Sequence, residues 1–153
     1  MKMNPIHQAS RDRMEPGRLS REGFLGDDDR PIEEIIAADL AVLVAHGVEK
    51  EALADFLDSL HDTADDALEM PVDCFNGKVN VCLIEVMGRM PCPFACGTRT
   101  HKACISVQIG EIGFTFTPMH VHLIREHGFF QGKGTAFRLE PDMLIKAFRA
   151  AQA

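Results

Sequence analysis

The chain contains neither tyrosine nor tryptophan, so ten phenylalanines supply every aromatic ring. This composition disfavours the aromatic platforms on which sugars or nucleic-acid bases stack. No stretch approaches the roughly 18 apolar residues needed to cross a bilayer. Residues 1–21 lack the apolar run of a secretory signal peptide. We therefore expect a cytoplasmic protein without a membrane-spanning segment.

Acidic residues outnumber basic ones, and the formal net charge of −7 argues against nonspecific attraction to nucleic acid. The charge is segregated, because residues 1–76 hold 18 of the 23 acidic residues and 7 of the 16 basic ones. We expect the two halves of the chain to attract one another. A weak contact with nucleic acid stays open through basic residues of the second half, namely Arg89, Arg99, Lys102, Arg125 and Lys133.

Cysteine is present in an odd number, five. Without a secretory signal, these cysteines are best interpreted as free thiols or metal ligands rather than as a disulfide framework. Two of them, Cys74 and Cys82, lie in expected strands and are interpreted as small buried hydrophobic residues.

The sequence predicts three successive segments. Residues 1–29 carry several of both and an acidic run, which predicts an extended or poorly ordered arm. Residues 30–69 repeat apolar positions at helical spacing on both sides of Gly47, which predicts a helical hairpin whose second helix covers about 49–68. Residues 70–153 are predicted to form a metal-binding β+α module, with 30–153 as one compact domain.

Within residues 70–153, apolar residues recur at every second position, as in a strand, rather than at the helical spacing of about 3.6 residues. Asn76-Gly77 between alternating residues predicts a β-hairpin, because both turn residues favour positive φ. Further strands are expected at 105–109, around Phe114 and Phe116, and at 136–139. Thr117-Pro118 begins a helix that Gly128 ends, and a last helix starts near Pro141. The predicted fold class is α+β, with the helical hairpin packed on a small, mainly antiparallel sheet.

Two pairs of potential metal ligands occur in this module. Cys92 and Cys96 are separated by a three-residue gap in a tight turn, and His122 and His127 by a four-residue gap on the expected helix. Tetrahedral zinc takes two thiolates from such a turn and two imidazoles from a following helix.

In the order turn, hairpin, helix, residues 92–127 resemble a C2H2-type zinc finger, over about a quarter of the chain. The resemblance implies a structural zinc ion held by Cys92, Cys96, His122 and His127. The segment between the second cysteine and the first histidine is about twice the usual length, so the finger-like segment is expected to be embedded in a larger sheet. His101, Cys104 and His120 are reserve candidates for the fourth ligand.

Two alternatives to a structural site follow from the same residues. His120, His122 and Glu126 resemble the first metal motif of the cupin barrels, which would make an open catalytic site in a small metalloenzyme. A nucleic-acid-binding accessory protein is the other alternative. The leading hypothesis is a small zinc-stabilised binding or regulatory protein without catalysis, which acts through contacts with a protein partner.

Overall fold

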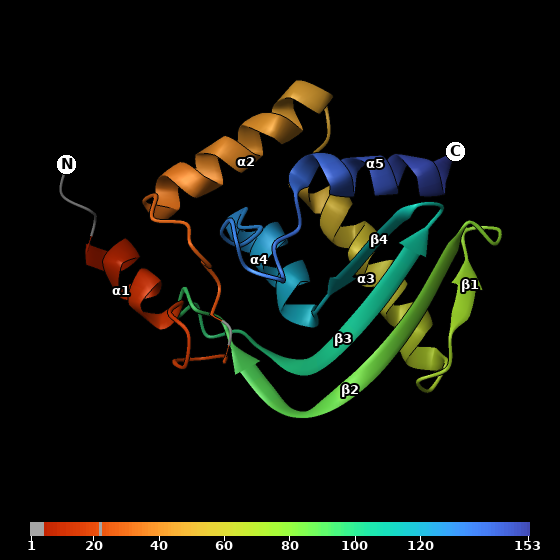
Figure 1. Ribbon diagram of the computed structural model, residues 1–153, viewed down its shortest axis with the longest axis horizontal. Helices are drawn as coiled ribbons and strands as arrows, with labels where there is room; N and C mark the ends of the chain where they lie inside the picture. Colours follow the sequence, from red (N-terminus) through yellow and green to blue (C-terminus); the bar gives the residue numbers. More distant parts are fainter. Residues whose placement is uncertain (1–4, 22) are drawn as a thin grey trace.

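The computed structural model of the chain describes residues 5–21 and 23–153 (Figure 1). In these residues the elements are α1 (Pro5–Arg13), α2 (Ile32–His46), α3 (Lys50–Asp66), β1 (Val72–Cys74), β2 (Val79–Pro91), β3 (Arg99–Ile109), β4 (Ile112–Phe116), α4 (Pro118–His127) and α5 (Pro141–Gln152). The strands form one antiparallel sheet in the order β1-β2-β3-β4. The predicted α+β class is therefore confirmed.

The first hairpin forms where the Asn-Gly pair predicts it. Cys74 pairs with Val79, so the loop covers residues 75–78. Asn76 and Gly77 have φ values of 57° and 80°, as the hairpin turn requires, and Phe75 shares this conformation at 51°.

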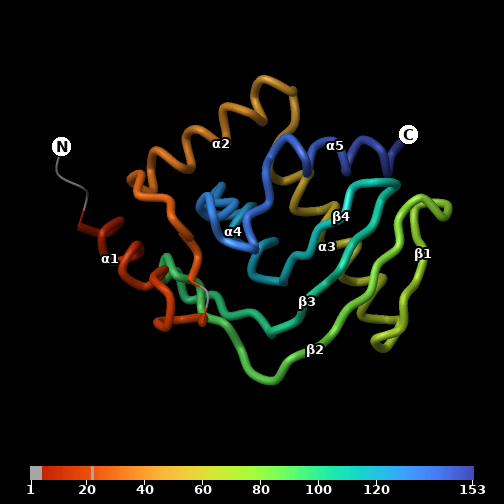
Figure 2. The backbone as a smooth tube through the Cα atoms, viewed as in Figure 1, coloured from red at the N-terminus to blue at the C-terminus, as the bar shows by residue number. Residues whose placement is uncertain are grey.

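The long strands β2 and β3 bend together and carry the sheet far beyond the predicted strand 105–109 (Figures 1 and 2). Their pairing shifts register between Val86 and Arg89 and then continues until Pro91 pairs with Arg99. The β3 part of this extension was missed because residues 99–102 are polar and show no apolar alternation.

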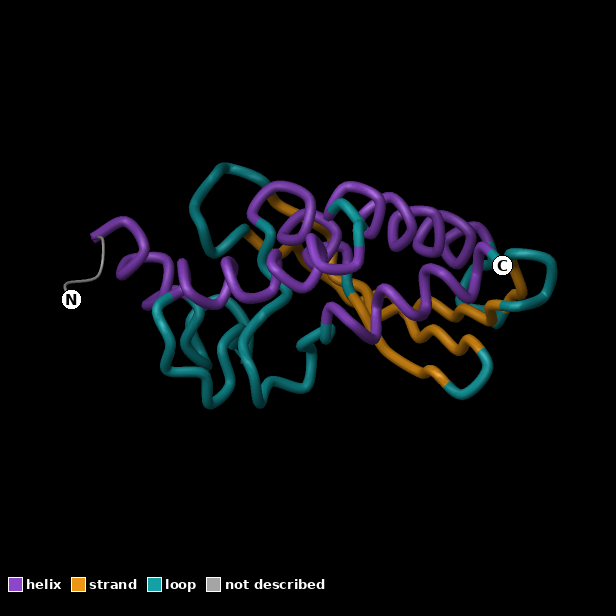
Figure 3. Tube along the Cα trace, turned by 90° about the horizontal axis from the view of Figure 1, so that it is seen from above, coloured by secondary structure: helices purple, strands orange, loops and turns teal. Residues whose placement is uncertain are grey.

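Helices α3, α4 and α5 contact the strands and lie on the concave side of the curved sheet (Figure 1). The larger core cluster lies here and includes Leu53, Leu57 and Leu60 of α3 together with Val81 and Ile105 of the sheet. Although α2 precedes α3 directly, it packs against α5. Most loop segments gather at the end of the molecule near the N-terminus (Figure 3).

The predicted extended arm, residues 1–29, contains helix α1, and residues 1–4 and 22 of it lie outside the described residues. The arm also buries Met14, Phe24 and Leu25 in a second core cluster with residues of α2 and α4. Hydrogen bonds hold it to the body, including one of 2.6 Å from Arg13 Nε to the carbonyl oxygen of Pro93. The sequence missed α1 because its residues are almost all polar and lack an amphipathic pattern.

Two further predictions concern residues 136–139 and membrane-spanning segments. The short strand predicted at 136–139 is wrong: these residues form a turn and an irregular segment that leads into α5. Leu139 N–H makes one backbone hydrogen bond, 3.3 Å long, to the carbonyl oxygen of Phe130. Among the described residues, no helix combines the length and the apolar character needed to span a bilayer.

Candidate metal centre

The two cysteines of the candidate site lie in the turn that joins β2 to β3. Cys92 N–H donates to the carbonyl oxygen of Thr98 at 2.9 Å, and Ala95 N–H donates to the carbonyl oxygen of Cys92 at 3.0 Å. Ala95 and Gly97 take positive φ values of 57° and 94°, which reverse the chain within the turn. Phe94 N–H points at Cys92 Sγ from 3.4 Å, the kind of contact that stabilises a thiolate.

The two histidines lie on α4, whose ends follow the predicted signals. Thr117 and His120 form a capping box around Pro118 in the first turn, and Gly128 ends the helix with a φ of 62°. These caps place His122 and His127 on the last two turns of α4, where they face the cysteine turn.

The structure brings the four predicted ligands together. Cys92 Sγ lies 3.5 Å from His127 Nε2, and Cys96 Sγ lies 3.2 Å from His122 Nε2. One ligand atom from each of the four residues lies within 4.8 Å of the other three. We call Cys92, Cys96, His122 and His127 the Cys2His2 cluster. Such a cluster could bind a metal ion.

The protonation of the Cys2His2 cluster differs between its members. Burial raises the pKa of the Cys92 thiol to about 11. Desolvation acts in the same direction on Cys96, but hydrogen bonds from the Thr98 backbone and hydroxyl lower its pKa below the ordinary value. Desolvation lowers the pKa of both His122 and His127, which favours the neutral imidazoles that metals bind. Metal binding at neutral pH would therefore release the proton of Cys92.

One neighbour of the Cys2His2 cluster was not anticipated from the sequence. The ring of Phe94 stacks on His127 with a centroid separation of 4.2 Å and an interplanar angle of 15°. This contact orients the imidazole and shields one side of the cluster from water. Its only sequence signal is an aromatic residue between the two cysteines, which does not by itself predict a partner on α4.

The reserve ligands lie elsewhere. His101 Nε2 is 3.0 Å from His61 Nε2 of α3, and Cys104 is paired with Ile84 in the β2–β3 ladder. His120 is buried, which lowers its pKa to about 4. Its Nδ1 accepts the Thr117 N–H at 2.9 Å, and its Nε2 lies 2.6 Å from the carbonyl oxygen of Phe137.

The open catalytic site at His120, His122 and Glu126 is not assembled, since among the described residues these three do not form a group of potential ligands. The sequence did not single out a second group on α3, Asp58, His61 and Asp62, whose ligand atoms also lie within 4.8 Å of one another. Its carboxylates are exposed, and exposed acidic residues are common without a metal ion.

The basic residues considered for nucleic acid are partly engaged within the protein. Arg125 Nη2 lies 2.6 Å from Asp55 and 4.0 Å from Asp58, both on α3. Arg89 and Arg99 line a surface depression together with Arg125 and the two acidic residues Asp58 and Glu126.

Comparisons of the chain with protein-family models, with curated proteins and with solved structures gave no match.

Proposed function

We propose that the Cys2His2 cluster binds one zinc ion that stabilises the fold of a cytoplasmic, non-catalytic binding or regulatory protein, which acts through protein contacts. The observation that carries the proposal is the convergence of two thiols and two imidazoles from separate elements within 4.8 Å. The reducing cytoplasm keeps such thiols available for a metal, and all five cysteines are free.

The distances within the Cys2His2 cluster suit zinc. With zinc–sulfur bonds of about 2.3 Å and zinc–nitrogen bonds of about 2.0–2.1 Å, neighbouring ligand atoms of a tetrahedron lie roughly 3.3–3.8 Å apart. The sulfur–nitrogen distance of 3.5 Å lies within this range, and the other, 3.2 Å, lies just below it. Two thiolates with two imidazoles are also a donor set that selects zinc over harder cations.

A site with four protein ligands leaves no position for a substrate, so its role is structural. A zinc ion contributes about 10 kcal/mol or more to the folding of small zinc-stabilised domains. That is comparable to the whole stability of a typical domain, roughly 5–15 kcal/mol. The ion would join the β2–β3 turn to α4, two elements held together otherwise by the second core cluster around Cys92 and Leu123.

A protein partner is supported by apolar side chains on the surface of β2 and of the turn after α3. We call this set the β2 patch; it comprises Leu68, Met70, Ile84, Val86 and Met87, and Met87 is 93 % exposed. Glu69 holds the turn beside the strand, because its carboxylate accepts the Glu85 N–H at 3.1 Å. Contiguous exposed apolar side chains on a globular protein mark interaction surfaces.

The zinc proposal is tested by elemental mass spectrometry of protein purified without chelator, alongside a Cys92→Ser variant. We expect about one zinc ion per chain, lost in the variant together with much of the folded structure. Cys104→Ser is the matched control, because Cys104 is a half-buried thiol outside the cluster, and it should keep the metal.

Absence of stoichiometric metal from the unaltered chain, with Cys92→Ser still folded, would contradict the proposal. X-ray absorption of the bound metal separates it from the enzyme alternative. Two sulfur and two nitrogen neighbours support a structural site, whereas a water ligand with histidine and carboxylate neighbours would support an open site at His120, His122 and Glu126. That alternative has less support, because both ring nitrogens of His120 are hydrogen-bonded within the protein.

A further inference from the structure

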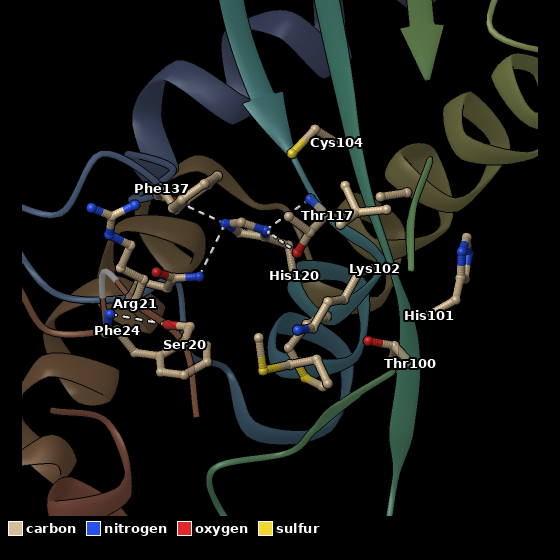
Figure 4. Close-up of a pocket in the computed structure, with 16 residues that line it drawn as sticks. Ser20, Arg21, Phe24, Thr100, His101, Lys102, Cys104, Thr117, His120 and Phe137 are labelled. Atoms are coloured by element: carbon tan, nitrogen blue, oxygen red, sulfur yellow. Dashed lines mark hydrogen bonds between the residues drawn. The ribbon is translucent and has the colours of Figure 1, made fainter. Parts of the chain in front are cut away.

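A cavity of about 380 Å³ lies between the arm, the bent part of β2 and β3, and the first turn of α4 (Figure 4). Its walls are mainly apolar and include Phe24, Val86, Met90, Met119 and Phe137. Small-molecule sites have volumes of roughly 300–1,000 Å³ and combine apolar walls with a few polar groups. The cavity therefore has the size and lining of a ligand site.

A buried amide without a full set of partners lies in this cavity. Gln131 is only 3 % exposed, and its side-chain Oε1 has no hydrogen-bond partner among the described residues. The other end of the amide, Nε2, lies 3.2 Å from Nε2 of His120. Leaving a buried polar atom unpaired costs about 1–3 kcal/mol, so an unpaired end facing a cavity indicates a missing partner.

The tautomer of His120 decides which kind of partner is missing. Because its Nδ1 accepts the Thr117 N–H, the ring proton lies on Nε2 and faces the carbonyl oxygen of Phe137. That N–H is better matched by the oxygen of the Gln131 amide than by its nitrogen, and a half-turn of the amide exchanges the two. The NH2 group of Gln131 then points toward the cavity as a donor.

Two further donors face the same space. Lys102 extends from β3 into the middle of the cavity, whereas the neighbouring His101 points away from it (Figure 4). Within the described part of the chain, Lys102 has neither an ion pair nor a hydrogen bond, and the buried Oγ1 of Thr100 has no partner. Arg21, an exposed residue of the arm, also lines the cavity, and no acidic residue is among the described lining residues.

We propose that this cavity binds a small carboxylic acid with an apolar body. Lys102 forms the ion pair with the carboxylate, Thr100 and Gln131 supply hydrogen bonds, and the apolar walls contact the body. An unpaired ammonium on the half-buried Lys102, together with neutral donors and with no acid among the described lining residues, selects an anion over a cation or a neutral molecule. None of these residues belongs to the Cys2His2 cluster, so this inference does not depend on the zinc proposal.

The test is isothermal titration calorimetry on the full chain, purified without chelator, with octanoate, 3-phenylpropionate and the uncharged 1-octanol. We expect at least one of the two acids to bind at one molecule per chain. We expect octanoate to bind at least about tenfold more tightly than 1-octanol, the minimum that a charge-assisted hydrogen bond provides. This comparison uses the unaltered chain, so it does not depend on the folding of any variant.

Variants at Lys102 assign the effect to the cavity. Lys102→Met keeps the length of the side chain without its charge and should remove the preference for the acid, while Lys102→Arg should restore it. Lys146→Met is the matched control, since Lys146 is an exposed lysine on α5 outside the cavity, and it should bind as the unaltered chain does. No binding of either acid at millimolar concentration, equal binding of octanoate and 1-octanol, or an unchanged preference in Lys102→Met would overturn the proposal.

Discussion

At the scale of single residues, a buried charged contact joins Asp39 of α2 to Arg138 of the segment before α5. Both guanidinium Nη atoms donate to the two carboxylate oxygens at 2.9 Å, and both side chains are almost fully buried. Arg138 also donates to the carbonyl oxygen of Gln131 at 2.7 Å, which fixes the backbone beside the cavity. This pair therefore connects α2, α5 and the wall of the cavity.

Asp39→Asn should lower the free energy of unfolding by about 3–5 kcal/mol, because it leaves a buried guanidinium without its main counter-charge. Glu140, 2.7 Å from Arg138 Nε, remains as a partial partner and favours the lower end of that range. Urea denaturation followed by circular dichroism measures the loss. Asp55→Asn, which breaks the more exposed pair with Arg125, should cost less than about 1 kcal/mol. Equal losses in the two variants would show that burial does not matter here.

At the scale of elements, the arm is attached to the loop before α5 through Asp28. Its carboxylate accepts hydrogen bonds from Arg30 Nε and Nη2 at 2.8 and 2.6 Å, and from Lys133 N–H at 3.1 Å. The side-chain hydrogen bonds from Arg30, with help from the backbone N–H groups of Lys133 and Arg30, hold the pKa of Asp28 well below its ordinary value despite desolvation. Since the folded pKa is depressed, the ionised carboxylate stabilises the fold above about pH 4, and this contribution is lost as the pH falls further.

Asp28→Asn should destabilise the protein by about 1.5–3 kcal/mol at pH 7, the range for hydrogen bonds to a charged group. The difference in unfolding free energy from the unaltered chain should narrow below pH 4, because the unfolded parent chain then takes up a proton on Asp28 that the folded chain does not. Urea unfolding at pH 7 and pH 3 measures both differences. Asp29→Asn, one residue along and exposed, serves as the control and should be near neutral. A difference of equal size at both pH values would mean that the charge of Asp28 has no role.

At the scale of the whole molecule, two core clusters stabilise the fold. The larger one lies between the sheet, α3 and α5, and the smaller one joins the arm to α2, α4 and the cysteine turn. Met14, Phe24 and Leu25 of the arm are all at most 6 % exposed within the smaller cluster. The arm is therefore part of the folded body and also one wall of the cavity.

A chain limited to residues 30–153 should be severely destabilised. Each of the three buried apolar side chains of the arm contributes about 2–5 kcal/mol, so together they approach the total stability of a typical domain, about 5–15 kcal/mol. We expect a poorly dispersed amide spectrum by NMR and a lower thermal midpoint than that of the full chain. A well-dispersed spectrum with an unchanged midpoint would show that the arm only covers an independently stable domain.

Much of the secondary structure was determined by the sequence alone, because it depends on local interactions. Thr117-Pro118 and Gly128 delimit α4, and Asn76-Gly77 predicts the first hairpin, since capping and positive φ are properties of a few neighbouring residues. The cysteine pair and the histidine pair were likewise recognisable, because each pair lies within one turn or one helix.

Tertiary structure alone decided what depends on residues distant in the chain. The polar segment of β3 from Arg99 to Lys102 forms a strand because β2 continues beside it, and α1 is held by side chains that bond to the body. The approach of Cys92 to His127, the burial of Asp39 against Arg138 and the cavity that Lys102 and Gln131 both line all join segments far apart in sequence. Such contacts form because packing of the two core clusters sets the distance between elements, and no local pattern encodes that distance.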